Sequence, residues 1–87
     1  MGNLEQIISF GMLLNLAQRY NQGQTIDKEE LYAAIESCKR SHNRWVDDNR
    51  ILTVEQKEND KRLYSKMLDA AKDYIEQCLR DENKLNE

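Results

Sequence analysis

Residues 26–45 read IDKEELYAAIESCKRSHNRW, and this stretch contains the clearest helix signal of the chain. Asp27 is a favoured N-cap residue, and Glu30 follows it at the capping-box spacing. Ile26 is placed to pack, as a hydrophobic staple, on the first apolar residue of the helix. Residues of the inner face then recur every three or four positions, at Leu31, Ile35, Cys38, His42 and Trp45. The pattern predicts a helix over about residues 28–48 with one narrow apolar stripe.

The segment before this helix predicts another one, over about residues 4–20. Asn3 is placed to cap its first turn, because an asparagine side chain accepts hydrogen bonds from the free amide groups there. Gly23 lies just beyond its last turn, and glycine reaches the left-handed conformation that closes helices without a Cβ penalty. A short polar linker around residues 21–25 therefore separates the first two helices.

A third helix is predicted over about residues 54–81. Thr53 and Gln56 have the spacing of a capping box at its start. Residues 55–62 contain no apolar side chain, so we expect the first two turns to be solvated. The apolar repeat follows at Tyr64, Leu68, Ala71, Ile75 and Cys78, and Met67, Tyr74 and Leu79 widen it. Residues 82–87 form a polar tail that we expect to fray.

Length and composition place these helices in one domain. The chain has 87 residues, well below the length at which chains usually split into two domains. It contains no proline, and its 39% hydrophobic and 33% charged residues lie in the globular range. Long helix-forming stretches between short polar breaks are typical of an all-α protein. We therefore expect a three-helix bundle that spans residues 1–87.

The helix over residues 4–20 is apolar around most of its circumference. One side holds Ile7, Gly11 and Leu14, another Met12 and Leu16, and a third Phe10, Leu13 and Ala17. The other two helices offer one apolar stripe each, so they can cover only part of this surface. Two explanations are open: this helix is the central element of a lopsided bundle with an ordinary exposed patch, or a second copy of the chain covers it.

We favour the second copy, because most soluble oligomers are symmetric and twofold dimers are the commonest. Gly11 fits this explanation, since a glycine inside a helix is costly unless a close helix crossing uses the missing Cβ. We therefore expect self-association through the first helix to complete the bundle. The residues expected in this contact are Ile7, Phe10, Gly11, Met12, Leu14 and Leu16.

The net charge, the apolar stretches and the number of cysteines argue against several classes of protein. The 13 Lys and Arg residues against 16 Asp and Glu residues give a formal charge of −3, which argues against a nucleic-acid partner. The longest apolar stretch, residues 7–17, is too short to cross a bilayer and lacks the flanking features of a signal peptide. Two cysteines are too few for a secreted disulfide framework. We expect a cytoplasmic protein without a membrane partner.

Few residues are arranged for chemistry. Cys38 and His42 share one side of a helix, a spacing used by metal ligands and by thiol–imidazole pairs. A structural zinc site needs a second pair of ligands, and Cys78 has no histidine near it. We therefore expect no metal, no cofactor, no catalytic residue and no enzymatic activity. His42 is the only histidine of the sequence, and histidine is the residue type used most often in pH switches. We favour a hydrogen-bonded histidine at the edge of the apolar stripe over a pH switch.

A cluster of cations with one indole is the remaining feature, and it consists of Lys39, Arg40, Arg44, Trp45 and Arg50. Guanidinium groups beside an aromatic ring are suited to binding the base and the phosphate of a nucleotide. These cations can also pair with acidic residues four positions away, and such pairing is typical of a solvated helix face. We favour a small non-enzymatic protein that acts by protein–protein interaction as a regulator, adaptor or inhibitor, with this region facing a partner. The alternative is a protein that sequesters or senses a nucleotide-like or phosphorylated ligand through the cluster.

Overall fold

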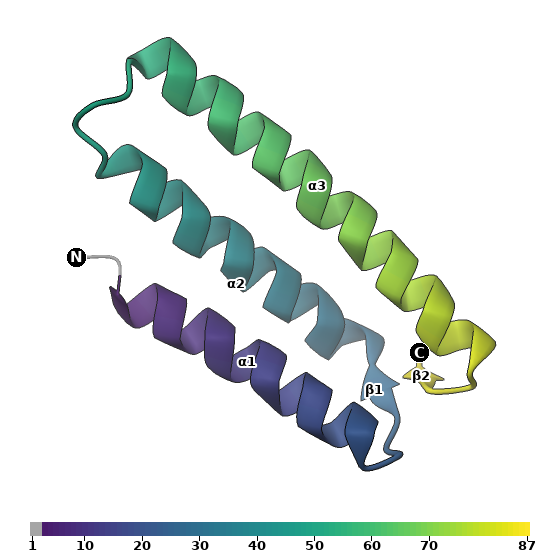
Figure 1. The fold of residues 1–87 in the computed structure, drawn as a ribbon. Helices are drawn as coiled ribbons and strands as arrows, with labels where there is room; N and C mark the ends of the chain where they lie inside the picture. Colours follow the sequence, from purple (N-terminus) through teal and green to yellow (C-terminus); the bar gives the residue numbers. More distant parts are fainter. Residues whose placement is uncertain (1–2) are drawn as a thin grey trace.

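The computed structural model describes residues 3–87, and in this range the chain forms three helices and two very short strands (Figure 1). The helices are α1 (Asn3–Asn21), α2 (Lys28–Asp47) and α3 (Val54–Asp81). The strands are β1 (Ile26–Asp27) and β2 (Leu85–Asn86). The predicted all-α, three-helix arrangement is confirmed. Helix periodicity and polar breaks were sufficient to find all three helices because both signals are local.

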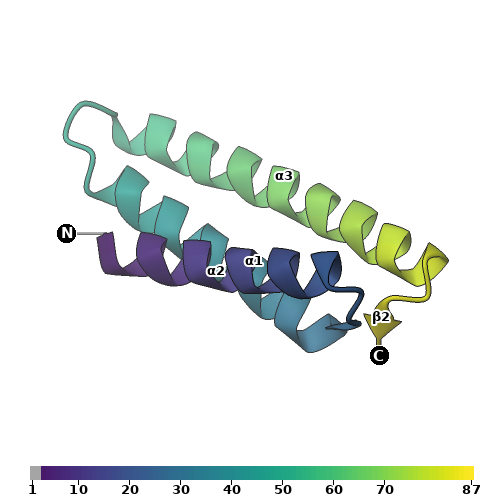
Figure 2. The same ribbon diagram turned by 60° about the horizontal axis from the view of Figure 1, so that its bottom comes forward.

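Helix α2 lies in the middle, with α1 on one side and α3 on the other (Figure 1). Helices α1 and α3 scarcely touch each other, so the three helices form one bent layer (Figure 2). The largest group of buried residues belongs to α2, and it comprises Leu31, Ala34, Ile35, Ser37, Ser41 and Val46. The most apolar helix, α1, is therefore an edge helix rather than the central one.

A hydrogen-bonded pair of serines lies in the contact between α1 and α2. Among residues 4–21 of α1, Ser9 alone is buried, with 6% of its surface exposed. Its Oγ lies 2.8 Å from the carbonyl oxygen of Glu5, and it lies 3.0 Å and 2.9 Å from the carbonyl oxygen and Oγ of Ser37. Small side chains let the two helices approach, and these partners satisfy the buried hydroxyls. Because Ser9 faces α2, most of the large apolar side chains of α1 face elsewhere.

The contact between α2 and α3 contains the apolar core. Ile26, Leu31, Ile35 and Leu79 form one buried cluster, and Leu68 and Leu85 pack against it. Ile26 and Leu31 are the pair that the sequence predicts as a hydrophobic staple, and both lie in this cluster. Val46 is fully buried near the opposite end of α2. These contacts fix how α2 lies against α3.

The caps of α2 and α3 differ from each other. Thr53 Oγ1 accepts from the Gln56 amide (3.1 Å), and Gln56 Oε1 accepts from the Thr53 amide (2.9 Å), so the predicted capping box of α3 is confirmed. Asp27 occupies the N-cap position of α2, but its side chain accepts no hydrogen bond from the helix. It accepts instead from Asn86 Nδ2 at 2.6 Å. The predicted side-chain cap of α2 is therefore wrong. The side chain of Asn3, predicted to cap α1, lies outside the described part of the chain.

The C-terminal segment is ordered, so the prediction that residues 82–87 fray is wrong. Asn83 has a φ of 58°, a left-handed conformation that asparagine tolerates, and it turns the chain back after α3. Strand β2 then pairs in parallel with β1, and the Ile26 amide donates to the Lys84 carbonyl oxygen at 2.7 Å. Leu85 packs against the core cluster. Strand β2 lies next to the start of α2 (Figure 2), and a single apolar residue in a polar tail thus has a place at the core.

Candidate interaction surface

An apolar hollow lies between α1 and α3, with α2 as its floor. It consists of two adjoining pockets of about 310 and 430 Å3 that share Leu13. The first pocket is lined by residues of α1 and α3 that include Leu13, Ala17, Tyr20, Tyr74, Ile75 and Cys78. The second is lined by residues that include Phe10, Leu13, Cys38, His42, Trp45 and Tyr64. We call the two pockets together the trough. The trough is open to solvent, because α1 and α3 do not close over α2.

Large aromatic side chains are exposed in the trough. Phe10 exposes 68% of its surface, Tyr74 exposes 72% and Trp45 exposes 51%. Of the described residues that line the two pockets, Glu82 is the only Asp, Glu, Lys or Arg. Its Oε1 accepts a hydrogen bond of 2.7 Å from the Tyr20 hydroxyl, and this contact raises the pKa of Tyr20. The trough is thus an aromatic surface whose one carboxylate already has a partner.

His42 and Cys38 lie in the floor of the trough. The His42 ring stacks on Tyr64, with 3.6 Å between the ring centroids and 13° between the ring planes. His42 Nε2 lies 2.6 Å from Asp60 Oδ1, so the imidazole has a carboxylate partner from α3. Burial raises the pKa of the Cys38 thiol, which lowers its thiolate fraction at neutral pH. Among residues 3–87, the structure shows no group of three or more His, Cys, Asp or Glu side chains placed to hold a metal ion.

The residues that the sequence places in self-association fall into three groups. Phe10 stands in the trough. Met12 and Leu16 are half-buried, and Leu16 packs against the core cluster. Ile7, Gly11 and Leu14 are exposed and lie between about 140° and 160° around α1 from the buried Ser9. We call these last three residues the outer α1 seam. A Cβ built on Gly11 meets no atom within 4 Å, so the chain itself makes no close crossing there.

Sequence reasoning missed the wall that α3 contributes. Leu63, Met67, Tyr74 and Ile75 expose between 39% and 72% of their surfaces, although they belong to the apolar part of this helix. The sequence did indicate this exposed surface, because Met67 and Tyr74 make the apolar stripe of α3 wider than a contact with one helix can bury. The stripe was assigned to the core of the chain. In the structure, Tyr74 and Ile75 line the trough, whereas Leu63 and Met67 are exposed and line neither of its pockets.

The cation cluster does not converge on one point. Lys39 Nζ lies 2.6 Å from Asp69 Oδ1 on α3, and Arg44 Nη1 lies 3.6 Å from Glu5 Oε1 on α1. Trp45 lies in the trough, while Arg40 and Arg50 are exposed to solvent. The Asp69 carboxylate raises the pKa of Lys39 through its hydrogen bond. The structure therefore pairs Lys39 and Arg44 with carboxylates on two different helices and leaves Arg40 and Arg50 in solvent.

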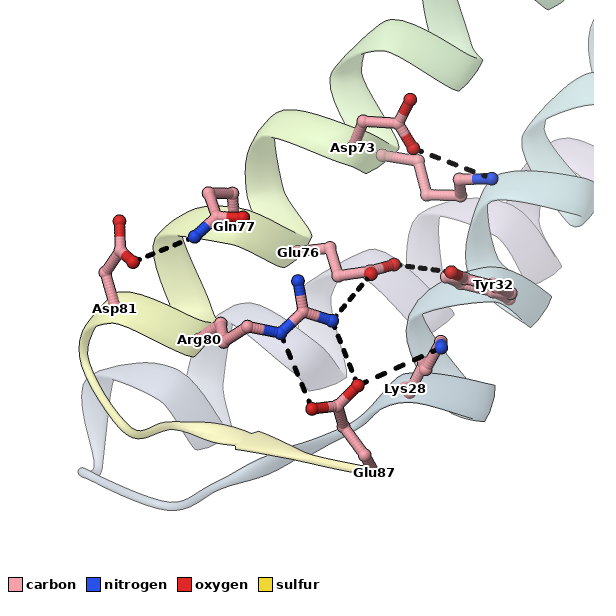
Figure 3. A network of polar contacts seen from close by, with 9 residues as sticks. Lys28, Tyr32, Asp73, Glu76, Gln77, Arg80, Asp81 and Glu87 are labelled. Carbon is pink, nitrogen blue, oxygen red and sulfur yellow. Dashed lines mark hydrogen bonds and ion pairs between the residues drawn. The ribbon is translucent and has the colours of Figure 1, made fainter.

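A network of polar contacts joins α2, α3 and the C-terminus (Figure 3). The Tyr32 hydroxyl donates to Glu76 Oε1 at 2.5 Å, and Arg80 Nη2 donates to Glu76 Oε2 and to Glu87 Oε1, both at 2.9 Å. Lys28 Nζ lies 3.9 Å from Glu87 Oε1. The hydrogen bond from Tyr32 lowers the pKa of Glu76, and the contact with Arg80 lowers the pKa of Glu87. The network holds the end of the chain against the start of α2.

Acid should loosen this network. The pKa of Glu76 and the pKa of Glu87 lie below their ordinary value of 4.5 in the folded chain, so their contribution is complete above about pH 4.5 and is lost as the pH falls through the folded values. We expect the thermal midpoint to fall between about pH 4.5 and pH 3. The double variant Glu76→Gln, Glu87→Gln should melt lower at pH 7 and fall less on acidification. The thermal midpoints of the unchanged protein and of the double variant are measured by circular dichroism as a function of pH. If the two midpoints fall in parallel on acidification, the prediction is contradicted.

Comparisons with known proteins do not indicate what this surface binds. No protein-family model, no curated protein and no solved structure matches the chain. Within residues 3–87, no helix has both the length and the apolarity needed to span a membrane. The function must therefore be inferred from the trough, the outer α1 seam and the polar contacts themselves.

Proposed function

We propose that this protein acts by protein–protein interaction, as a small regulator, adaptor or inhibitor that works as a homo-oligomer. The trough is the observation that carries the proposal. The cores of protein interfaces are enriched in aromatic residues and depleted in charged ones. Phe10, Trp45 and Tyr74 supply exposed aromatic surface, and among the described residues that line the trough Glu82 is the single carboxylate, paired with Tyr20. An open apolar hollow between helices is also the shape that receives a helix of a partner.

The distribution of polar groups supports an interaction surface on one side of the molecule. Glu76 is two residues from both Tyr74 and Cys78, so it lies about 160° around α3 from these two trough residues. Its carboxylate pairs with Tyr32 and Arg80, away from the trough. Helix α3 therefore presents an apolar side to the trough and a polar side away from it. Exposed aromatic side chains gathered in one hollow are typical of a contact with another protein.

A small anionic ligand has weaker support. Such a ligand requires several cations that point at one site, as in bidentate recognition of phosphate. Lys39 and Arg44 point instead to carboxylates on two different helices. The trough beside Trp45 contains no cation of the cluster among its lining residues. The geometry of the described residues thus favours a polypeptide partner.

Photo-crosslinking tests the proposal. The amino acid p-benzoylphenylalanine is incorporated in place of Tyr74, in the trough, or in place of Asp73, the adjacent position on α3 outside the trough. The side chain of Asp73 is 77% exposed and Tyr74 is 72% exposed, so the two probes have similar access to solvent. We expect irradiation in the native cell to yield polypeptide adducts of the Tyr74 variant and far fewer of the Asp73 variant. Equal yields, or no adduct at position 74, would refute the proposal.

A further inference from the structure

We infer that two copies of this chain pack with their troughs facing each other, so that α3 and α1 form the interface together and the outer α1 seam stays exposed. This inference rests on the proposed function, because it names the occupant of the same surface. It differs from self-association through α1 alone. In that arrangement the outer seam would be covered and the α3 wall of the trough would stay open.

The surface area of the chain is the first argument. A compact monomer of 10.3 kDa exposes about 5,350 Å². This chain exposes 6234 Å². The excess is about 900 Å², and a standard stable interface buries about 800 Å² on each partner. One copy therefore carries about the extra surface that one dimer contact removes.

The shape of the chain is the second argument. A compact chain of 87 residues has a radius of gyration of about 12 Å, whereas this one has 14.7 Å. Domains consist of two or more packed layers of secondary structure, because each element must bury its apolar face against another. The three helices here form a single bent layer, and the trough is its uncovered face. A second copy supplies the missing layer.

Size favours the trough over the outer α1 seam. A standard interface uses about 20–30 residues on each side. All three helices contribute residues to the lining of the trough, whereas the exposed apolar residues of α1 outside the trough, Leu4, Ile7, Ile8 and Leu14, belong to one helix. Each copy has a formal charge of −3, so a charged face would repel its twofold mate. Charge is compatible with either surface, because Glu82 in the trough accepts a hydrogen bond from Tyr20 and the outer α1 seam contains no charged residue.

The twofold arrangement leaves the outer α1 seam for other contacts. Ile7 exposes 67% and Leu14 exposes 46% of its surface in the single chain. Neither residue lines the trough, so facing troughs do not cover them. A dimer of this kind presents two copies of the seam on its outer sides, where Gly11 has open space above its Cα.

The mass of the particle in solution tests the inference. Light scattering should give the purified protein twice the mass of the 10.3 kDa chain. Tyr74→Glu places a carboxylate in the interface, and we expect the dimer dissociation constant to rise about 100-fold or more, since a buried unpaired charge is costly. Ile7→Glu is the matched control, because Ile7 is 67% exposed and Tyr74 is 72% exposed. This control should remain a dimer, and circular dichroism should show equal helix content in both variants.

The outcomes separate the inference from the proposed function. If Ile7→Glu dissociates the dimer and Tyr74→Glu does not, the copies meet through the outer seam and the inference fails. If the purified protein is monomeric while the probe at position 74 captures a different protein, the inference fails and the interaction proposal stands. Should Tyr74→Glu misfold, Phe10→Glu on the other wall replaces it. Trp45 provides a variant-free measurement, because its emission should shift to the red when the dimer is diluted into monomers.

Discussion

Leu31→Ala is expected to lower the free energy of unfolding by about 3 kcal/mol, as large-to-small changes in a packed core do. Leu31 exposes 3% of its surface and lies in the cluster with Ile26, Ile35 and Leu79. The buried apolar core of the described chain comprises six residues, so little other packing remains to compensate. Small domains have a total stability of about 5–15 kcal/mol, and this one substitution therefore removes a large part of it.

The measurement is urea denaturation followed by circular dichroism. All proteins must be compared at one concentration, because a dimer makes the midpoint depend on concentration. Ile51→Ala is the control, since Ile51 is 90% exposed and its change should stay within about 0.5 kcal/mol. A loss below about 1 kcal/mol for Leu31→Ala would show that the cluster around Leu31 is not the main core.

The second large effect is expected when the chain ends at Lys84. This truncation removes strand β2, the packing of Leu85 on the core cluster and the hydrogen bond from Asn86 to Asp27. We expect a loss of about 2 kcal/mol, from partial apolar burial and from hydrogen bonds worth about 1 kcal/mol each. Ile26 should show the effect most directly, because it pairs with Leu85 in the β1–β2 ladder and lies in the cluster against which Leu85 packs.

Hydrogen exchange and urea midpoints measure this loss. The Ile26 amide should exchange faster in the truncated chain, while amides in the middle of α2 should be affected less. Glu87→Gln is the control, because it removes the ion pairs of the last residue and leaves Leu85, Asn86 and strand β2 in place, so it should lower the urea midpoint less than the truncation does. If the truncated chain unfolds at the same urea concentration as the full chain, the C-terminal strand is not part of the stable structure.

Features that depend on residues close together in the sequence were predicted correctly, whereas features that depend on distant residues were not. The capping box of Thr53 and Gln56 was predicted correctly because it operates within one helical turn. The pairing of β1 with β2 was not predicted, because Asp27 and Asn86 are 59 residues apart and no local pattern links them. The side chain of Asp27 illustrates the difference, since its partner is this distant residue and not the helix amide that its position suggests.

The candidate surface was foreseen in part. The sequence indicated that α1 has more apolar surface than its own chain can bury, and Phe10 does stand exposed in the trough. It did not indicate that Leu16 enters the core or that Tyr74 of α3 stays exposed. Those outcomes depend on which side of each helix is used for packing. The choice is made by contacts between helices and cannot be obtained from one helix alone.

The sequence alone determined the three helices, their approximate ends and the excess of apolar surface on α1, because helix periodicity and caps act over a few residues. The tertiary structure alone decided that α2 lies in the middle, since the small residues Ser9 and Ser37 let α1 approach α2 closely. It also decided that α1 and α3 stay apart and leave the trough between them. Helix packing depends on close complementary shape over long sequence separations, and that information appears only when the helices are placed together.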